Sequence, residues 1–111
     1  MNAKKLLLRV FDFIAPPRVL KVVEGDSIPD QVPIRNLVLA REDDEDWCVA
    51  MRCPCGCGRK IELLIIKEAE PRWDLHVDLK GRPTLSPSVW LRDGCSSHFW
   101  VRAGRVRWCP E

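Results

Sequence analysis

The sequence lacks the features that place a protein in a membrane or on nucleic acid. No apolar run approaches the roughly 20 residues of a membrane-spanning helix. Near the N-terminus, Arg9 and Asp12 interrupt the apolar stretch that a signal peptide requires. The formal net charge is only +2, from 18 basic and 16 acidic residues, so electrostatic attraction to phosphate backbones is weak. We therefore expect a cytoplasmic protein with no membrane contact and no strong affinity for nucleic acid.

Helical periodicity is also nearly absent, and no internal repeat is visible. Trp47, Val49, Met51 and Cys53 instead alternate with their neighbours at the period of two that is typical of a strand. Residues 60–67 are mostly apolar, as in a strand buried on both faces, and residues 99–108 suit a hairpin that turns at a glycine. Residues 5–14 suit a strand or a short helix, with the strand favoured. Other strand candidates are residues 19–23, 37–40 and 73–79. The predicted fold is mainly β, a small antiparallel β domain held together by a zinc site.

The length of 111 residues fits one domain. We expect residues 1–33 to form an N-terminal strand and loop extension and residues 34–111 to form the metal-binding core. The densest charge block, residues 42–46, reads Glu-Asp-Asp-Glu-Asp. It suits a solvated loop between two strands, and an acidic docking patch for a basic partner is the alternative.

Six cysteines in a chain of this length carry the strongest local signal. In a reducing compartment, clustered cysteines bind metal or do redox work more often than they form disulfides. Residues 53–58 read Cys-Pro-Cys-Gly-Cys-Gly, and residues 95–98 read Cys-Ser-Ser-His. Zinc prefers four Cys or His ligands in a tetrahedron, commonly as short-spaced groups that lie far apart in the sequence. The pattern predicts a structural Zn²⁺ site, with buried structural thiols or a redox cluster as the alternatives.

The ligands can be ranked from their neighbours. Cys55 and Cys57 are flanked by glycine and are free to turn toward one ion, whereas Cys53 continues an apolar strand face. We therefore expect Cys55, Cys57, Cys95 and His98 as ligands, with Cys53 next and Cys109 after it. Cys48 lies on the opposite side of its strand and is not expected to bind metal.

Local motifs of known catalytic sites are missing. The chain has no H-E-x-x-H, no phosphate-binding P-loop and no deaminase-type H-x-E. A cysteine nucleophile with a histidine base stays open, because such residues meet in space and not in sequence. Five tryptophans occur without any tyrosine, as core side chains or as an aromatic binding surface. Arg102, Arg105 and Arg107 give the C-terminal hairpin a basic face, which is more typical of a solvated surface than of a nucleic-acid site.

Several of these segments together resemble a family of small uncharacterised prokaryotic zinc-binding-like proteins. The match covers about residues 47–109, and its marks are Cys53 to Gly58, Thr84 to Ser88, Cys95 to Trp100, and Trp108 with Cys109. Genes of this family often accompany bacterial ubiquitin-like conjugation genes for E1-like, E2-like and JAB-type proteins in defence operons. The resemblance implies a zinc-binding accessory or ligase-like partner of that machinery. It transfers no catalytic residue.

The leading hypothesis is a zinc-binding domain that contacts a protein, an E1-like, E2-like or ubiquitin-like component of such a system. A zinc- or cysteine-dependent hydrolase or transferase is the alternative from another class. A nucleic-acid-binding zinc module is the third hypothesis.

Overall fold

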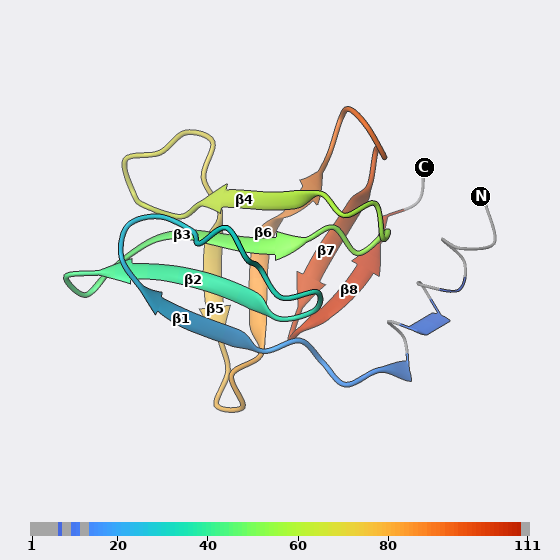
Figure 1. The fold of residues 1–111 in the computed structure, drawn as a ribbon, viewed down its shortest axis with the longest axis horizontal. Coiled ribbons are helices and arrows are strands. Elements are labelled where there is room, and N and C mark those ends of the chain that lie inside the picture. The colour runs from blue at the N-terminus through green and yellow to red at the C-terminus, as the bar shows by residue number, and fades with distance from the viewer. Residues whose placement is uncertain (1–6, 8–9, 12–13, 110–111) are drawn as a thin grey trace.

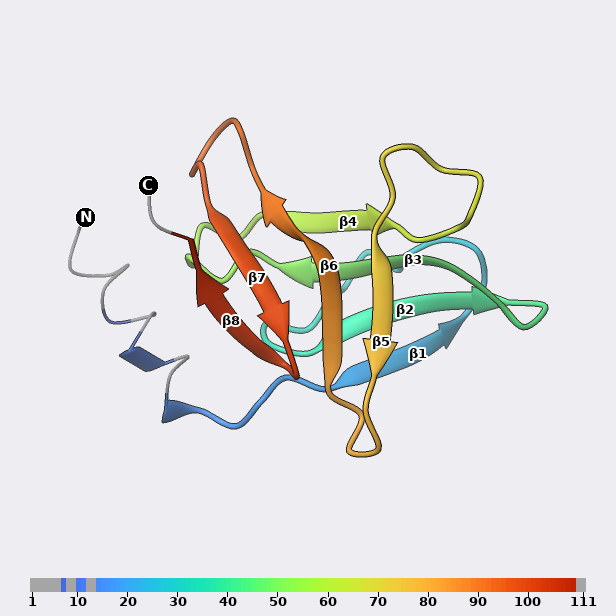
Figure 2. The same ribbon diagram turned by 180° about the vertical axis from the view of Figure 1, so that it is seen from behind.

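The computed structural model describes residues 7, 10–11 and 14–109 of the chain. Eight strands form two four-stranded sheets, with strand order β1-β2-β3-β4 in the first and β5-β6-β7-β8 in the second. The first sheet faces the viewer in Figure 1 and the second faces the viewer in Figure 2. The strands are β1 (Leu20–Glu24), β2 (Leu37–Glu42), β3 (Glu45–Arg52), β4 (Lys60–Leu64), β5 (Asp74–Val77), β6 (Pro83–Trp90), β7 (His98–Arg102) and β8 (Arg105–Trp108).

The two sheets pack face to face around one apolar core, and their strands run across each other (Figure 2). The core takes Leu39 and Met51 from the first sheet and Leu85, Phe99 and Val101 from the second, all of them fully buried. Every neighbouring pair of strands is antiparallel except β1 and β2, which are parallel. The predicted fold class, a small and mainly antiparallel β domain, is therefore confirmed.

The outer face of the first sheet is also partly covered. Val38 and Ala50 point away from the main core and pack under Val32, which belongs to the loop between β1 and β2. The second sheet has no comparable cluster on its outer face among the described residues. No helix in the described part of the chain is long and apolar enough to cross a membrane.

Three elements differ from the sequence expectations. β6 was not predicted, because Pro83 and Pro87 argue against a strand; Pro83 is its first residue and Pro87 lies where its pairing is interrupted. β4 is an edge strand with one buried face, so Leu64 is 52% exposed instead of buried. Most of the expected strand at 5–14 falls outside the described residues, and the four described ones, Leu7, Val10, Phe11 and Ile14, have helical backbone.

The predicted C-terminal hairpin is present, and its turn is hydrogen-bonded to the segment that precedes β1. Gly104 lies in the turn between β7 and β8 with a φ of 77°. Its carbonyl accepts a hydrogen bond from the Arg18 backbone N–H, and its own N–H donates to the Pro83 carbonyl. A Cβ at this position would collide with the Arg18 carbonyl oxygen.

We predict that Gly104→Ala destabilises the fold strongly, because the substitution combines left-handed backbone strain with a clash against main-chain atoms. Gly81→Ala is the matched control, since Gly81 has the same φ of 77° but open space around its Cβ position. Backbone strain alone should lower the free energy of unfolding by about 1 kcal/mol, and the clash should add about 1–3 kcal/mol. Urea denaturation of the two variants measures the difference, and equal losses would contradict it.

Candidate metal centre and Ser–His pair

Four cysteines meet where the turn between β3 and β4 lies next to the loop between β6 and β7. They are Cys53, Cys55, Cys57 and Cys95, and their Sγ atoms all lie within 4.8 Å of one another. The Sγ of Cys53 lies 3.3 Å from that of Cys55 and 3.7 Å from that of Cys95. All six cysteines are free thiols in the structure. The group could hold a metal ion such as zinc.

The spacing of the sulfurs fits a tetrahedral ion. With Zn–S bonds of about 2.3 Å, the sulfurs of a tetrahedral site lie about 3.8 Å apart, close to the distances seen here. A disulfide would instead bring one pair to about 2.05 Å. The first sheet provides three of the thiols and the second sheet provides one, so a bound ion would join the two sheets.

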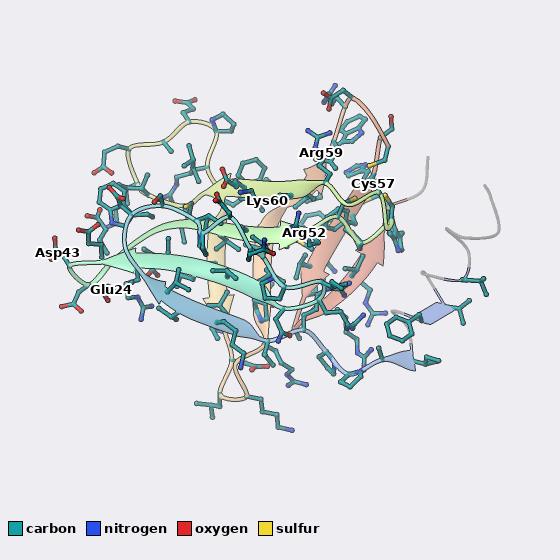
Figure 3. The ribbon with its side chains drawn as sticks, viewed as in Figure 1. Glu24, Asp43, Arg52, Cys57, Arg59 and Lys60 are labelled. Atoms are coloured by element: carbon teal, nitrogen blue, oxygen red, sulfur yellow. The ribbon has the colours of Figure 1, made fainter. Side chains whose placement is uncertain are left out.

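The backbone of the two loops explains how the thiols converge. Gly56 and Gly58 adopt positive φ values of 87° and 84°, which lets the chain curl between successive cysteines. Figure 3 shows Cys57 in this turn with Arg59 nearby. The guanidinium of Arg59 pairs with the Asp93 carboxylate of the facing loop at 2.9 Å. The ion pair is exposed and adds little stability, but it aligns the two loops.

The thiols of the group differ in the direction in which their pKa is shifted. Burial raises the pKa of Cys53 and also that of Cys57. Burial acts in the same direction on Cys95, but hydrogen bonds from the hydroxyl and backbone of Ser97, together with Cys53 and Cys55, outweigh it and lower the pKa to about 6. Four crowded thiols cannot all ionise without a compensating positive charge. A bound divalent cation would supply that charge, because metals bind the thiolate form.

Ser97 supports the cysteine group directly. Its side chain is buried, and its Oγ lies 3.2 Å from the Sγ of Cys95 and 3.5 Å from that of Cys53. A hydroxyl in this position can donate to a metal-bound thiolate and orient it.

The structure places the expected ligands unequally. Cys53, Cys55, Cys57 and Cys95 come together, whereas His98 lies outside the group. The imidazole of His98 is on β7, and its Nε2 lies 3.0 Å from the Oγ of Ser88 on β6. The geometry thus favours Cys53 over His98 as the fourth ligand, because the strand that begins at His98 turns its side chain toward β6. Cys48 and Cys109 also lie outside the group.

An irregularity in β6 brings Ser88 to this histidine. Leu85 pairs with Val101 and Val89 pairs with Phe99, so residues 86–88 of β6 face only Trp100 of β7. Bulges of this kind re-aim side chains and are frequent beside active sites. The backbone at Ser88 is held from the β5 side, since the indole N–H of Trp73 donates to the Ser88 carbonyl at 3.4 Å.

Trp90 fixes the plane of the imidazole. Trp90 pairs with His98 across the two strands, and their rings stack with centroids 4.6 Å apart and an interplanar angle of 10°. Within the described part of the chain, no carboxylate hydrogen-bonds to the imidazole of His98. The ring is therefore oriented by stacking, together with the hydrogen bond to Ser88.

Sequence reasoning missed Ser88. The residue falls in the Thr84–Ser88 stretch that marks the family resemblance, but it carries no local nucleophile motif such as G-x-S-x-G. Its meeting with His98 depends on the bulge and on the pairing of β6 with β7, which spacing alone does not reveal. The available signal was the presence of only two histidines, one of them close to a serine-rich segment.

No curated protein and no solved structure matches the chain significantly. A family model matches residues 24–109, a range that contains the four clustered cysteines and the Ser88–His98 pair. The family is described as "Bacterial ubiquitination-like system serine protease (BubE)". This match confirms the link to bacterial ubiquitin-like conjugation that the resemblance implied. The chain belongs to the BubE family and is a component of a bacterial ubiquitination-like system.

Proposed function

We propose that this protein is a serine hydrolase that cleaves acyl bonds of proteins in the ubiquitination-like system, with Ser88 as nucleophile and His98 as general base. The observation that supports it is the hydrogen bond of 3.0 Å between Ser88 Oγ and His98 Nε2, the distance expected of an activated serine. Both side chains are partly exposed on β6 and β7, so a carbonyl group can approach them from solvent. The family description names the same reaction class.

The chemistry follows from the two atoms in contact. When Nε2 accepts the hydroxyl proton, the proton of the neutral imidazole is on Nδ1. The Oγ of Ser88 then bonds to the carbonyl carbon, and the protonated His98 returns the proton to the leaving group as the acyl bond breaks. Water, deprotonated by the same imidazole, hydrolyses the ester on Ser88 and regenerates the hydroxyl. Trp90 holds the imidazole in the plane that both transfers require.

The cysteine group takes a structural role in this proposal. Four thiolates would complete the ligand set that a structural zinc ion prefers, which would leave no ligand position open for water. A bound zinc would fix Cys95, which lies in the loop that leads into His98. In this proposal Ser88 and His98 carry out the reaction. The structural role belongs to Cys53, Cys55, Cys57 and Cys95.

Hydrolysis replaces the accessory or ligase-like role as our leading interpretation. A cysteine-dependent ligase or hydrolase would need a thiol that hydrogen-bonds to a histidine, and among the described residues no cysteine Sγ does so with His98 or His76. The proposal keeps the expected contact with a protein component of the ubiquitin-like system, because the proposed substrate is itself a protein. We place the reaction in the cytoplasm, in agreement with the expectation from the sequence.

The first test replaces Ser88 and His98 in turn. Ser88→Ala should abolish labelling by a fluorophosphonate probe and lower the rate of ester hydrolysis by about 10³-fold or more. His98→Ala should behave similarly, because the hydroxyl loses its base. Ser86→Ala is the matched control, since Ser86 is an exposed serine of the same strand. Labelling that persists in Ser88→Ala would rule out this nucleophile.

The second test concerns the stack on His98. Trp90→Leu should lower kcat by about tenfold and leave KM nearly unchanged, because the imidazole loses its fixed orientation. Trp90→Phe keeps an aromatic face and should restore most of kcat. Trp90 is 51% exposed, so neither variant should shift Tm by much. Equal kcat values in both variants would contradict the orienting role.

The third test concerns the metal. The purified protein should contain about one zinc per chain, and Cys55→Ser or Cys95→Ser should lose the zinc together with cooperative unfolding, because structural zinc contributes on the order of 10 kcal/mol. Cys109→Ser is the control outside the group. His98→Ala should retain zinc while losing activity. Zinc loss from His98→Ala would restore this residue as a ligand and would contradict the division of roles.

A further inference from the structure

The outer face of β6, β7 and β8, the last three strands of the second sheet, carries a local excess of positive charge. Strands β6, β7 and β8 contain no Asp or Glu, although the whole chain has 16 acidic residues. β7 and β8 contribute Arg102, Arg105 and Arg107. The formal net charge of +2 therefore hides a basic region on one face of the molecule.

The register places this charge on the same face as the Ser88–His98 pair. Phe99 and Val101 of β7 are buried in the core, so His98, Trp100 and Arg102 point to the opposite, outer side. Arg107 of β8 is the cross-strand partner of Trp100. This sheet faces the viewer in Figure 2, with β7 between β6 and β8.

Two tryptophans border the pair, and an arginine lies over each of them. The guanidinium carbon of Arg102 lies 4.6 Å from the ring centroid of Trp100, and that of Arg92 lies 3.9 Å from the centroid of Trp90. A guanidinium that rests on an indole is already ordered, and its N–H groups stay free to bind carboxylates in pairs. Arg92, Arg102 and Arg107 are all exposed.

We propose that the outer face of β7 and β8, defined by Trp100, Arg102 and Arg107, docks an acidic segment of the protein substrate beside Ser88 and His98. This inference rests on the proposed function, and it names a feature by which the substrate is recognised. Carboxylates complement a face that has arginines and no acidic residue, and guanidinium–carboxylate pairs give both orientation and affinity.

The size of the basic face favours a polypeptide over nucleic acid. Proteins that hold nucleic acid tightly neutralise about 6–10 phosphates, whereas this face offers a few arginines. A short acidic stretch of a protein needs only two or three such contacts, and the tryptophans add apolar surface for its side chains.

The test measures binding directly, so it does not depend on catalysis. Fluorescein-labelled decapeptides of alternating Glu and Gly, and of alternating Gln and Gly, are titrated with the wild-type protein at about 50 mM salt, and anisotropy is recorded. We expect the Glu peptide to bind at least about tenfold more tightly than the Gln peptide, with an affinity that falls as salt screens the charges. The double variant R102E/R107E should lose this preference.

The matched control is K21E/K80E, which makes the same change in charge at two exposed lysines on β1 and after β5. It should bind the Glu peptide like the wild type. Zinc content and Tm of both double variants show that each is folded.

Three outcomes would overturn the inference: equal binding of the two peptides by the wild type, unchanged binding by R102E/R107E, or tighter binding of a thymidine decanucleotide than of the Glu peptide. Fluorophosphonate labelling of Ser88 in the wild type tests the proposed function separately. Labelling without a preference for the Glu peptide would remove the docking surface alone, and a preference without labelling would remove the hydrolase.

Discussion

The approach of the two cysteine loops is the contact on which the rest of the site depends. Cys53, Cys55 and Cys57 follow β3 of the first sheet and Cys95 follows β6 of the second. Cys53 and Cys55 are also part of the apolar core, and Cys95 packs against it. Crowded thiols repel each other once they ionise, so the convergence favours a cation at its centre. A bound ion would join the two sheets where these loops meet, and the apolar core joins the sheets in the middle.

The same contact extends to the Ser88–His98 pair through the loop that follows β6. The Leu91 N–H donates to the Ser97 carbonyl at 2.8 Å, while the Ser97 hydroxyl reaches the sulfurs of Cys53 and Cys95. The next residue is His98. A small displacement of the cysteine group would therefore move the imidazole relative to Ser88, and a metal ion bound by the cysteines would limit such movement.

The two sheets differ in how much of their outer faces is covered. The first sheet is covered on its inner face by the core and on part of its outer face by Val32 and neighbouring loop residues. The second sheet buries one face and exposes the other, where a serine, a histidine, tryptophans and arginines gather. An exposed sheet face offers rigid positions for these side chains, because β6 and β7 are paired on both sides of the interruption at residues 86–88.

The amino-acid pattern by itself determined the β class, most of the strands and the C-terminal hairpin, and it marked the cysteine-rich turn, Cys95 and His98 as candidate metal ligands. Each of these follows from neighbours in the sequence: alternation at a period of two, a glycine at a turn, and thiols separated by glycine. Only the tertiary structure decided that His98 faces Ser88 and not the cysteines. The position of His98 beside Ser88 depends on strand β6, whose prolines argue against a strand in the sequence. It also depends on the bulge at residues 86–88 opposite Trp100. The register between β6 and β7 depends on both segments and on the shift between Leu85 and Val89, so no pattern within one segment contains it.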